Sequence, residues 1–415
     1  MKRTFLLLTA AVLASAAVVV AAGAAPSAAP GVTAKSILLE GTFPLSGPAS
    51  GYAPIPAAMQ AYFQYANAQK GGVNGRKIIF KYQDDGYNPA NTVQLTHQFV
   101  EQDHAFALVG GLGTEPQTAV RQYLNDQKVP QLFVSTGATT FDRDWAEYPW
   151  TIGWQPDYEA EGAIYGKYIA TKLPKAKVGV VYQNDDYGND YLRGLKAGLT
   201  LEHTSQIVDA EPFDVTSPNP AAQIAKLKAA GADTLVIFIT PTGTIQSYVI
   251  ATKLGWKPDN VITNSVSATD PFLTIATKSG SDITNGTITV NYLLDPSNPI
   301  YNKQPGMKLY RQIMAKYDPK GNANDPLNLY GVAKAWSTVQ VLKAAGKNLT
   351  RAGLMKSARN TNFSAANKNP NPFALPGVVE RTKGGYQYPI SQVTLVKYEN
   401  NVFQPFGGLI NGRGK

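Results

Sequence analysis

Short apolar runs alternate along this chain with longer segments in which apolar residues recur every three or four positions. The short runs predict buried strands, and the longer segments predict helices with one buried face. The predicted strands are residues 36–42, 77–82, 106–109, 131–134, 177–182 and 234–239, with a further short strand opening at Ile262. The predicted helices are residues 57–68, 91–101, 115–125, 157–172, 220–230 and 244–254, with another beginning near Tyr187. This order predicts parallel sheets that helices cover on both faces.

Two sheets rather than one are indicated by the length of 415 residues and by the restart of the pattern after residues 150–155. Further helices are predicted at residues 306–317, 329–345 and 351–360, and a strand pair at residues 392–401. Three segments are predicted to cross between the lobes, at residues 150–155, 287–293 and 362–376.

The predicted fold class is therefore α/β, with two doubly wound parallel-sheet lobes joined by a three-segment hinge. Lobe 1 is assigned residues 25–152 and 291–362, and lobe 2 is assigned residues 153–290 and 363–415. Ligands of open α/β sheets bind beyond the carboxyl ends of the strands, so two facing lobes would share one cleft.

A glycine-rich turn separates the predicted strand 106–109 from the helix 115–125. Gly110, Gly111 and Gly113 fall within four residues, and Thr114 stands at a plausible helix start. Backbone N–H groups approach a ligand closely where no Cβ intervenes, and the first N–H groups of a helix are unpaired and partly positive. The turn predicts an anion site, although an ordinary strand-to-helix turn capped by Thr114 would show the same residues.

The N-terminus has the pattern of an export signal. Lys2-Arg3 precedes an apolar run from Phe5 to Val20, and small residues follow up to Ala24. Residues 1–24 are therefore predicted to be a cleaved signal peptide, with a retained membrane anchor as the alternative. The chain contains no cysteine, so neither disulfides nor a lipid-modified cysteine is expected. We expect a periplasmic or secreted protein.

The composition argues against several function classes. The net charge is +9, or +7 without Lys2 and Arg3 (9 − 2), and the basic residues form no run of five, which does not suggest a nucleic-acid partner. Hydrolase, zinc-protease and nucleotide-loop motifs are missing, and the three histidines lack metal-ligand spacing. Asp84-Asp85 and Asp185-Asp186 follow predicted strands, where Asp is common in turns and caps. No catalytic residue, metal or cofactor is predicted.

Seven segments between residues 43 and 233 occur in an order that matches a known family. They are residues 43–48 (FPLSGP), 71–78 (GGVNGRKI), 84–85, 109–114, 135–139 (STGAT), 186–188 (DYG) and 224–233. Together they resemble the periplasmic binding proteins of type I fold, in the branch that contains the leucine/isoleucine/valine-binding proteins of ABC importers.

The resemblance implies a carboxylate site on lobe 1. In the family, a Ser or Thr after the glycine-rich turn and its neighbouring N–H groups hold the ligand carboxylate, which here falls on Gly113 and Thr114. A second carboxylate contact comes from the small-residue loop, which here is Gly137, Ala138 and Thr139. Hydroxyl and N–H groups bind a carboxylate through directed hydrogen bonds without burying a second full charge. Capping for Thr114 and a turn for Thr139 are the alternatives.

The resemblance also implies aromatic contacts and shows departures. Tyr52 matches an aromatic residue after the first loop, and Tyr187 matches a tyrosine that closes over the ligand from lobe 2, with core packing as the alternative for both. Ser265 stands where amino-acid binders carry an acid for the α-ammonium, and Thr240 stands where a second-lobe aromatic residue is expected. The first crossing, residues 150–154 (WTIGW), also departs from the family pattern.

The missing acid leaves the charge of the ligand open, because a buried ammonium without a carboxylate partner would cost several kcal/mol. Either Asp157, Asp186 or Asp270 serves the ammonium, or the ligand lacks that charge. An apolar or aromatic carboxylate, or an amide, is then as plausible as leucine.

The predicted function is that of a non-catalytic, monomeric solute-binding protein of an ABC importer. It would bind a small carboxylate-bearing solute between the lobes, close by hinge motion and deliver the solute to a membrane permease. The solute would be a branched-chain or other amino acid, or a related organic acid or amide. A ligand-sensing protein for a signalling receptor is the first alternative. An exported hydrolase is the second, and the missing nucleophile motifs disfavour it.

Overall fold

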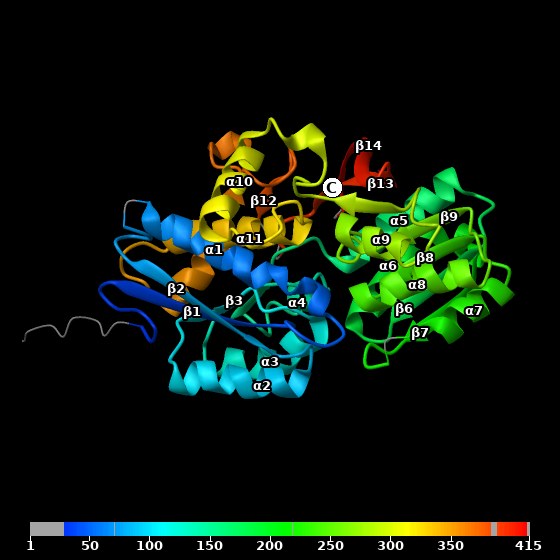
Figure 1. Cartoon of the computed structure of the whole chain (residues 1–415). Coiled ribbons are helices and arrows are strands. Elements are labelled where there is room, and N and C mark those ends of the chain that lie inside the picture. Colours follow the sequence, from blue (N-terminus) through cyan, green and yellow to red (C-terminus); the bar gives the residue numbers. More distant parts are fainter. Residues whose placement is uncertain (1–28, 70, 218, 383–387, 413–415) are drawn as a thin grey trace, which may run out of the picture.

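The computed structural model describes residues 29–412 except 70, 218 and 383–387, so the predicted signal peptide lies outside the described residues. Two lobes lie side by side, each built on one main β-sheet with helices against it (Figure 1). The chain passes between them three times: between β5 (Thr151–Gly153) and α5 (Tyr158–Lys172), after β10 (Ile288–Asn291), and after α12 (Arg351–Ala358). The predicted α/β class with two sheet-based lobes is confirmed.

Lobe 1 contains a five-stranded parallel sheet in the order β2-β1-β3-β4-β5. Its other strands are β1 (Ser36–Phe43), β2 (Lys77–Asp84), β3 (Ala107–Val109) and β4 (Gln131–Val134). β3 and β4 are buried along their whole length, as the uninterrupted apolar runs of a covered parallel sheet require. Its helices are α1 (Pro54–Ala68), α2 (Pro89–His97), α3 (Thr114–Asp126), α4 (Thr140–Arg143), α10 (Pro305–Tyr317), α11 (Pro326–Ala344) and α12.

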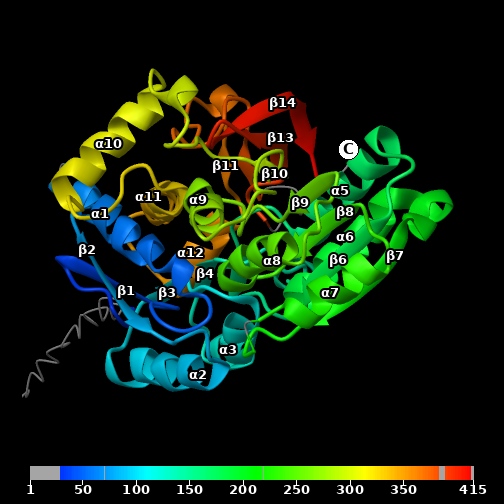
Figure 2. The same ribbon diagram turned by 45° about the vertical axis from the view of Figure 1, so that its right-hand side comes forward.

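Helix α11 is the central helix of lobe 1. Asp325 caps its first turn by accepting from Leu327 N at 2.9 Å, and Pro326 occupies the first helical position. Residues 327–339 are buried on every side of the helix, and α1 packs along it (Figure 2). A helix buried all round has no polar face, so any charged residue within it has to be explained.

Lobe 2 contains a seven-stranded mixed sheet in the order β14-β13-β10-β9-β8-β6-β7. The strands besides β10 are β6 (Val178–Gln183), β7 (Ile207–Phe213), β8 (Thr234–Phe238), β9 (Asn260–Thr263), β13 (Gln392–Glu399) and β14 (Val402–Asn411). The strands from β6 to β10 are parallel, whereas the predicted C-terminal strand pair forms an antiparallel hairpin that joins β10 at the edge. The other helices are α6 (Asp186–His203), α7 (Ala221–Ala229), α8 (Pro241–Lys253) and α9 (Asp270–Lys278).

Close packing of α5 against α6 depends on glycine. A Cβ added to Gly162 would lie 2.4 Å from the carbonyl oxygen of Tyr191, and one added to Gly166 would lie 2.2 Å from that of Leu195. Both distances are far below van der Waals contact, so the helices approach this closely only because α5 has no side chains there. The contact holds in place the first turn of α5, which carries Tyr158 and Glu161.

Most of the predicted strands and helices are present with shifted ends, whereas α4, β7 and α9 were not predicted. Predicted helix 91–101 is α2 followed by a π-helical turn (Gln98–Gln102), and predicted helix 244–254 begins three residues earlier as α8. The predicted crossing 362–376 contains the short strand β11 (Asn362–Phe363), which pairs with β12 (Glu380–Arg381). The residue bounds assigned to the lobes stay a prediction. No helix of the described residues is long and apolar enough to cross a membrane.

Candidate functional site

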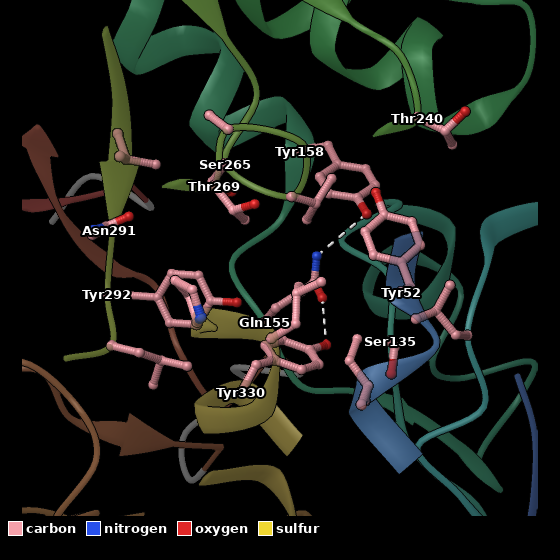
Figure 3. Close-up of a pocket in the computed structure, with 18 of the residues that line it drawn as sticks. Tyr52, Ser135, Gln155, Tyr158, Thr240, Ser265, Thr269, Asn291, Tyr292 and Tyr330 are labelled. Atoms are coloured by element: carbon pink, nitrogen blue, oxygen red, sulfur yellow. Dashed lines mark hydrogen bonds between the residues drawn. The ribbon is translucent and has the colours of Figure 1, made fainter. Parts of the chain in front are cut away.

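A pocket of about 920 Å³, including the part open to solvent, lies between the two lobes. Most of its wall is aromatic and aliphatic, and its polar groups come from both lobes and from the connections between them (Figure 3). The residues that line it include Tyr52, Gly113, Thr114, Ser135, Gln155, Tyr158, Tyr187, Thr240, Ser265, Asn291, Tyr292, Asp295 and Tyr330. Six of the nine predicted site residues are among them: Tyr52, Gly113, Thr114, Tyr187, Thr240 and Ser265.

The lobe 1 wall presents the N-terminus of α3. Gly113 has φ 111°, and a Cβ there would lie 2.7 Å from the ring of Tyr87, so the turn requires glycine. Gln117 N donates to Gly113 O at 3.2 Å, and the preceding N–H groups of the helix therefore have no intrahelical acceptor. Thr114 Oγ1 shares a 2.7 Å hydrogen bond with Thr136 Oγ1. This corner of the pocket offers N–H donors and a hydroxyl to an anionic group.

The other three predicted site residues do not line the pocket. The backbone N and Oγ1 of Thr139 donate to Asp190 Oδ2 at 2.6 and 3.0 Å, which links lobe 1 to helix α6 of lobe 2. Ala138 O accepts from the hydroxyl of Tyr388, and Gly137 O accepts from Tyr158 N at 2.8 Å. The structure thus gives this loop contacts with the opposite lobe, and its contact with a ligand remains a prediction.

Further contacts close the mouth of the pocket. Thr242 Oγ1 in α8 donates to Pro48 O of lobe 1 at 2.8 Å. A Cβ on Gly51 would lie 3.0 Å from the ring of Phe272 in α9, so the loop before α1 touches lobe 2 closely (Figure 2). Tyr52 OH is 3.4 Å from Ser267 Oγ. The lobes are therefore in a closed arrangement.

A chain of hydrogen bonds runs along one wall of the pocket (Figure 3). Lys334 Nζ donates to Tyr330 OH at 2.8 Å. Tyr330 OH in turn donates to Gln155 Oε1 at 2.7 Å. Gln155 Nε2 then donates to Tyr158 OH at 3.3 Å. Since Gln155 lies in the first connection between the lobes, its amide joins α11 of lobe 1 to α5 of lobe 2. Neither Gln155 nor Lys334 was predicted as a site residue.

The tyrosines of the pocket are neutral hydrogen-bonding groups. Burial raises the pKa of Tyr52, Tyr158, Tyr187 and Tyr330 above the ordinary value for a phenol. Their hydroxyls therefore keep their protons at neutral pH. Tyr158 packs edge-on against Tyr187 with ring centroids 4.9 Å apart, which fixes both rings beside the cavity.

Ser265 is held by a buried carboxylate. Its backbone N and its Oγ donate to Oε1 and Oε2 of Glu161, both at 2.7 Å, and Tyr165 OH donates to Oε1 at 2.7 Å. Glu161 is 2% exposed, and burial raises its pKa. Because the single hydroxyl proton of Ser265 points at Glu161, Oγ turns its lone pairs toward the pocket. The position where the family pattern predicts an acid thus holds a serine with an acid behind it.

A second carboxylate, that of Asp295, also lies in the wall of the pocket. Oδ1 of Asp295 accepts from Ser297 N and Oγ at 2.8 and 2.7 Å, whereas Oδ2 is buried without a hydrogen-bond partner among the described residues. Burial raises the pKa of this carboxyl group. A buried acceptor without a donor is costly, so Oδ2 is suited to an N–H or O–H group of a ligand.

The acids proposed from sequence for an ammonium group have other contacts. Asp157 caps α5 by accepting from Ala160 N at 2.7 Å, and Asp270 accepts from Tyr398 OH at 3.1 Å. Asp186 begins α6, which Asp185 caps by accepting from Gly188 N at 3.2 Å. None of these lines the pocket. The capping role expected for the paired aspartates is therefore found at Asp185.

The site residues missed from sequence lie one turn or one loop away from the recognised motifs. Lys334 is the one charged residue among residues 327–342 of α11, and this pattern could have marked it. Glu161 could not be told from Glu159, because both fall in the first turn of one helix. The described residues contain no cluster of three or more His, Cys, Asp or Glu side chains arranged to hold a metal ion.

A model of a known protein family, described as periplasmic binding protein, matches residues 42–398. This match covers most of both lobes and every pocket residue named above. The chain belongs to the periplasmic binding protein family. Members of this family are binding proteins rather than enzymes, in keeping with an interlobe pocket that carries hydrogen-bonding groups on an apolar wall.

Individual relatives point to one branch of the periplasmic binding proteins. The chain is 25% identical over 313 residues to Leu/Ile/Val-binding protein homolog 1 of Brucella melitensis biotype 1, covering 74% of this chain and 77% of that protein. A branched chain amino acid ABC transporter protein from Thermus thermophilus with bound valine has a TM-score of 0.78 at 17% identity, over 92% of this chain and 97% of that one. The resemblance found from the sequence motifs is confirmed.

A fatty acid ABC transporter substrate-binding protein from Thermomonospora curvata has a similar TM-score of 0.75, at 22% identity over 91% of this chain and 94% of that one. The same fold is therefore found in a protein with bound valine, which is zwitterionic, and in a protein named for fatty acids, which are anionic. The choice between them has to come from the side chains of the pocket.

Proposed function

We propose that this chain is the extracytoplasmic solute-binding protein of an ABC importer, and that its solute is a small carboxylate with an apolar side chain, held between the lobes. The observation that carries the proposal is the pocket itself, in which the N-terminus of α3 faces aromatic walls and Ser265 of the other lobe. The N–H groups before Gln117 suit a carboxylate, and the surrounding rings suit an aliphatic or aromatic side chain.

An α-ammonium on the solute is supported by two hydrogen-bond acceptors in the pocket wall. Ser265 Oγ presents lone pairs because Glu161 takes its proton, and Asp295 Oδ2 has no donor of its own among the described residues. An amino acid would place its ammonium near one of these groups. An organic acid without an ammonium would leave both unused, which makes it the weaker candidate.

Closure of the lobes follows from contacts with both of them. A solute that touches Thr114 in lobe 1 and Ser265 in lobe 2 binds the closed state more tightly than the open one, and so shifts the population toward closure. The closed form would be what a membrane permease recognises. Export through the N-terminal signal, a monomeric state and a periplasmic or secreted location belong to the same proposal.

Isothermal titration calorimetry tests the proposal directly. The purified chain is titrated with L-leucine, L-valine, L-phenylalanine, 4-methylpentanoate and 3-phenylpropanoate, and with the amide of each. At least one acid is expected to bind with a free energy of about 8 kcal/mol, which corresponds to micromolar affinity. Absence of binding by all five acids would refute the proposed solute class.

A further inference from the structure

Lys334 is the one charged side chain buried in the middle of α11 within the described residues. It is 0% exposed, and none of the ion pairs formed by the described residues includes it. A buried ammonium without a carboxylate partner is strongly unfavourable, and lysine is seldom fully buried unless it is paired. The position therefore requires an explanation that packing alone does not supply.

The ammonium group of Lys334 is aimed at the pocket wall. Nζ donates to Ser135 Oγ and to Tyr330 OH, and both of these residues line the cavity. Nζ also lies 4.3 Å from the centroid of the Tyr330 ring and 5.4 Å from that of Trp154. These rings and hydroxyls stabilise a cation only in part, because none of them carries a full negative charge.

Ser135 connects Lys334 to the N-terminus of α3, where the pocket offers N–H donors and the Thr114 hydroxyl to an anion. Ser135 O accepts from Gly113 N at 3.3 Å, and Ser135 N donates to Gly111 O at 2.8 Å. The serine therefore sits between the ammonium of Lys334 and the turn that begins α3. An anion bound at Thr114 would be separated from Lys334 by this one residue, in a region from which water is largely excluded and where charges interact strongly.

We propose that Lys334 is the specificity-determining residue that makes the pocket prefer a carboxylate over the corresponding amide, by acting on the bound anion through Ser135 and Tyr330. The inference rests on the proposed function and adds the residue that selects the charge of the solute. In this proposal the carboxylate of the ligand supplies the negative charge that Lys334 lacks within the protein.

The hydrogen-bond chain gives the physical route for this effect. A hydroxyl that accepts from an ammonium becomes a stronger donor itself, and the hydroxyl hydrogens of Ser135 and Tyr330 can rotate between a protein acceptor and a ligand oxygen. Ser135 Oγ now donates to Gly110 O at 2.6 Å. Burial lowers the pKa of Lys334 well below its ordinary value, and a carboxylate beside the chain would oppose that shift.

The test compares acids with amides in two variants. Lys334→Met removes the charge and keeps the length of the side chain, and Lys343→Met, an exposed lysine on the same helix, is the matched control. Calorimetry at pH 7 uses the probes L-leucine, 4-methylpentanoate and 3-phenylpropanoate and their amides. In Lys334→Met the affinity for the acids should fall about tenfold or more while that for the amides changes less than about twofold, because only the acids carry the charge. Lys343→Met should leave both unchanged.

The ratio of acid to amide affinity separates a charge effect from a structural one, because a distorted pocket would weaken both probes. An unchanged ratio in Lys334→Met would overturn the assignment of Lys334 while leaving the proposed function intact. Wild-type protein that binds none of the acids would overturn both. If Lys334→Met does not fold, Tyr330→Phe serves instead, since it keeps the ring and removes the hydroxyl. It should lower the ratio at least about threefold, and an unchanged ratio would again overturn the proposal.

Discussion

Replacing Glu161 by glutamine should turn the Ser265 hydroxyl from a hydrogen-bond acceptor toward the pocket into a donor, without changing the shape of the pocket. In the wild-type protein, Oε1 accepts from Ser265 N and Tyr165 OH, and Oε2 accepts from Ser265 Oγ. The glutamine carbonyl can keep the first two donors, which places its NH₂ group opposite Ser265 Oγ. That hydroxyl must then accept from the amide and turn its own hydrogen toward the pocket.

The expected loss of affinity follows from the hydrogen bond that disappears. A ligand ammonium that donates to Ser265 Oγ makes a charge-assisted hydrogen bond, typically worth about 1.5–3 kcal/mol. L-leucine should therefore bind Glu161→Gln about tenfold to a hundredfold more weakly. 4-Methylpentanoate, which is leucine without the ammonium, should bind the variant as well as the wild type, since it donates nothing at this position.

The assay is calorimetry over a series of pH values, because burial raises the pKa of Glu161 and a higher pH favours its ionised form. As the pH falls and Glu161 takes up a proton, wild-type affinity for L-leucine should decline toward that of the variant. Glu159→Gln is the control, because Glu159 lies in the same turn but pairs with Arg193 at 3.2 Å, away from the pocket wall. Equal affinity of L-leucine for wild type and Glu161→Gln would refute the claim that Ser265 Oγ accepts a hydrogen bond from the ligand.

Three further predictions address the other polar groups. Thr114→Val should weaken binding of 4-methylpentanoate about tenfold and lower the free energy of unfolding by about 1–2 kcal/mol, because Thr136 Oγ1 loses its 2.7 Å partner. Calorimetry measures the affinity and urea denaturation the free energy of unfolding. Unaltered affinity would contradict an anion site at the N-terminus of α3. Asp295→Asn should weaken L-leucine less than about threefold if Ser265 takes the ammonium, and a larger loss than in Glu161→Gln would move the ammonium to Asp295 Oδ2. Glu380→Gln tests how the stability of the fold depends on pH. Burial raises the pKa of Glu380 to about 7, so the contribution of its protonated side chain to the free energy of unfolding is present below pH 4.5 and is lost as the pH rises through 7. The wild type should lose about 2 kcal/mol of unfolding free energy relative to the variant between pH 5 and pH 8 in urea titrations, and parallel pH profiles would refute this.

Local patterns in the sequence were sufficient for most of the fold and for one side of the site. The glycine-rich turn and Thr114 are neighbours in the chain, so their place at the start of a helix follows from turn and helix-end chemistry. The alternation of strands and helices likewise determined the order of elements on which both sheets are built. These features depend on residues that lie within one turn of one another.

Contacts between distant segments could not be predicted in the same way. Thr139 bonds to Asp190, 51 residues further along the chain, and nothing local to the small-residue loop indicates that partner. Lys334 and Ser135 are 199 residues apart. The acid behind Ser265 comes from another helix, 104 residues earlier. Such pairs are set by the packing of whole elements, which a single sequence does not reveal.

The central claim is that a carboxylate solute binds between the lobes and holds them closed. Since the native chain has no cysteine, Ala90→Cys on α2 and Ala222→Cys on α7, both exposed, allow one spin label on each lobe. Pulsed electron spin resonance then measures the distance between the labels without ligand and with the acid that wild-type protein binds most tightly. Saturating ligand should give a shorter, narrower distance distribution than the ligand-free protein. An unchanged distribution at saturating ligand would contradict it.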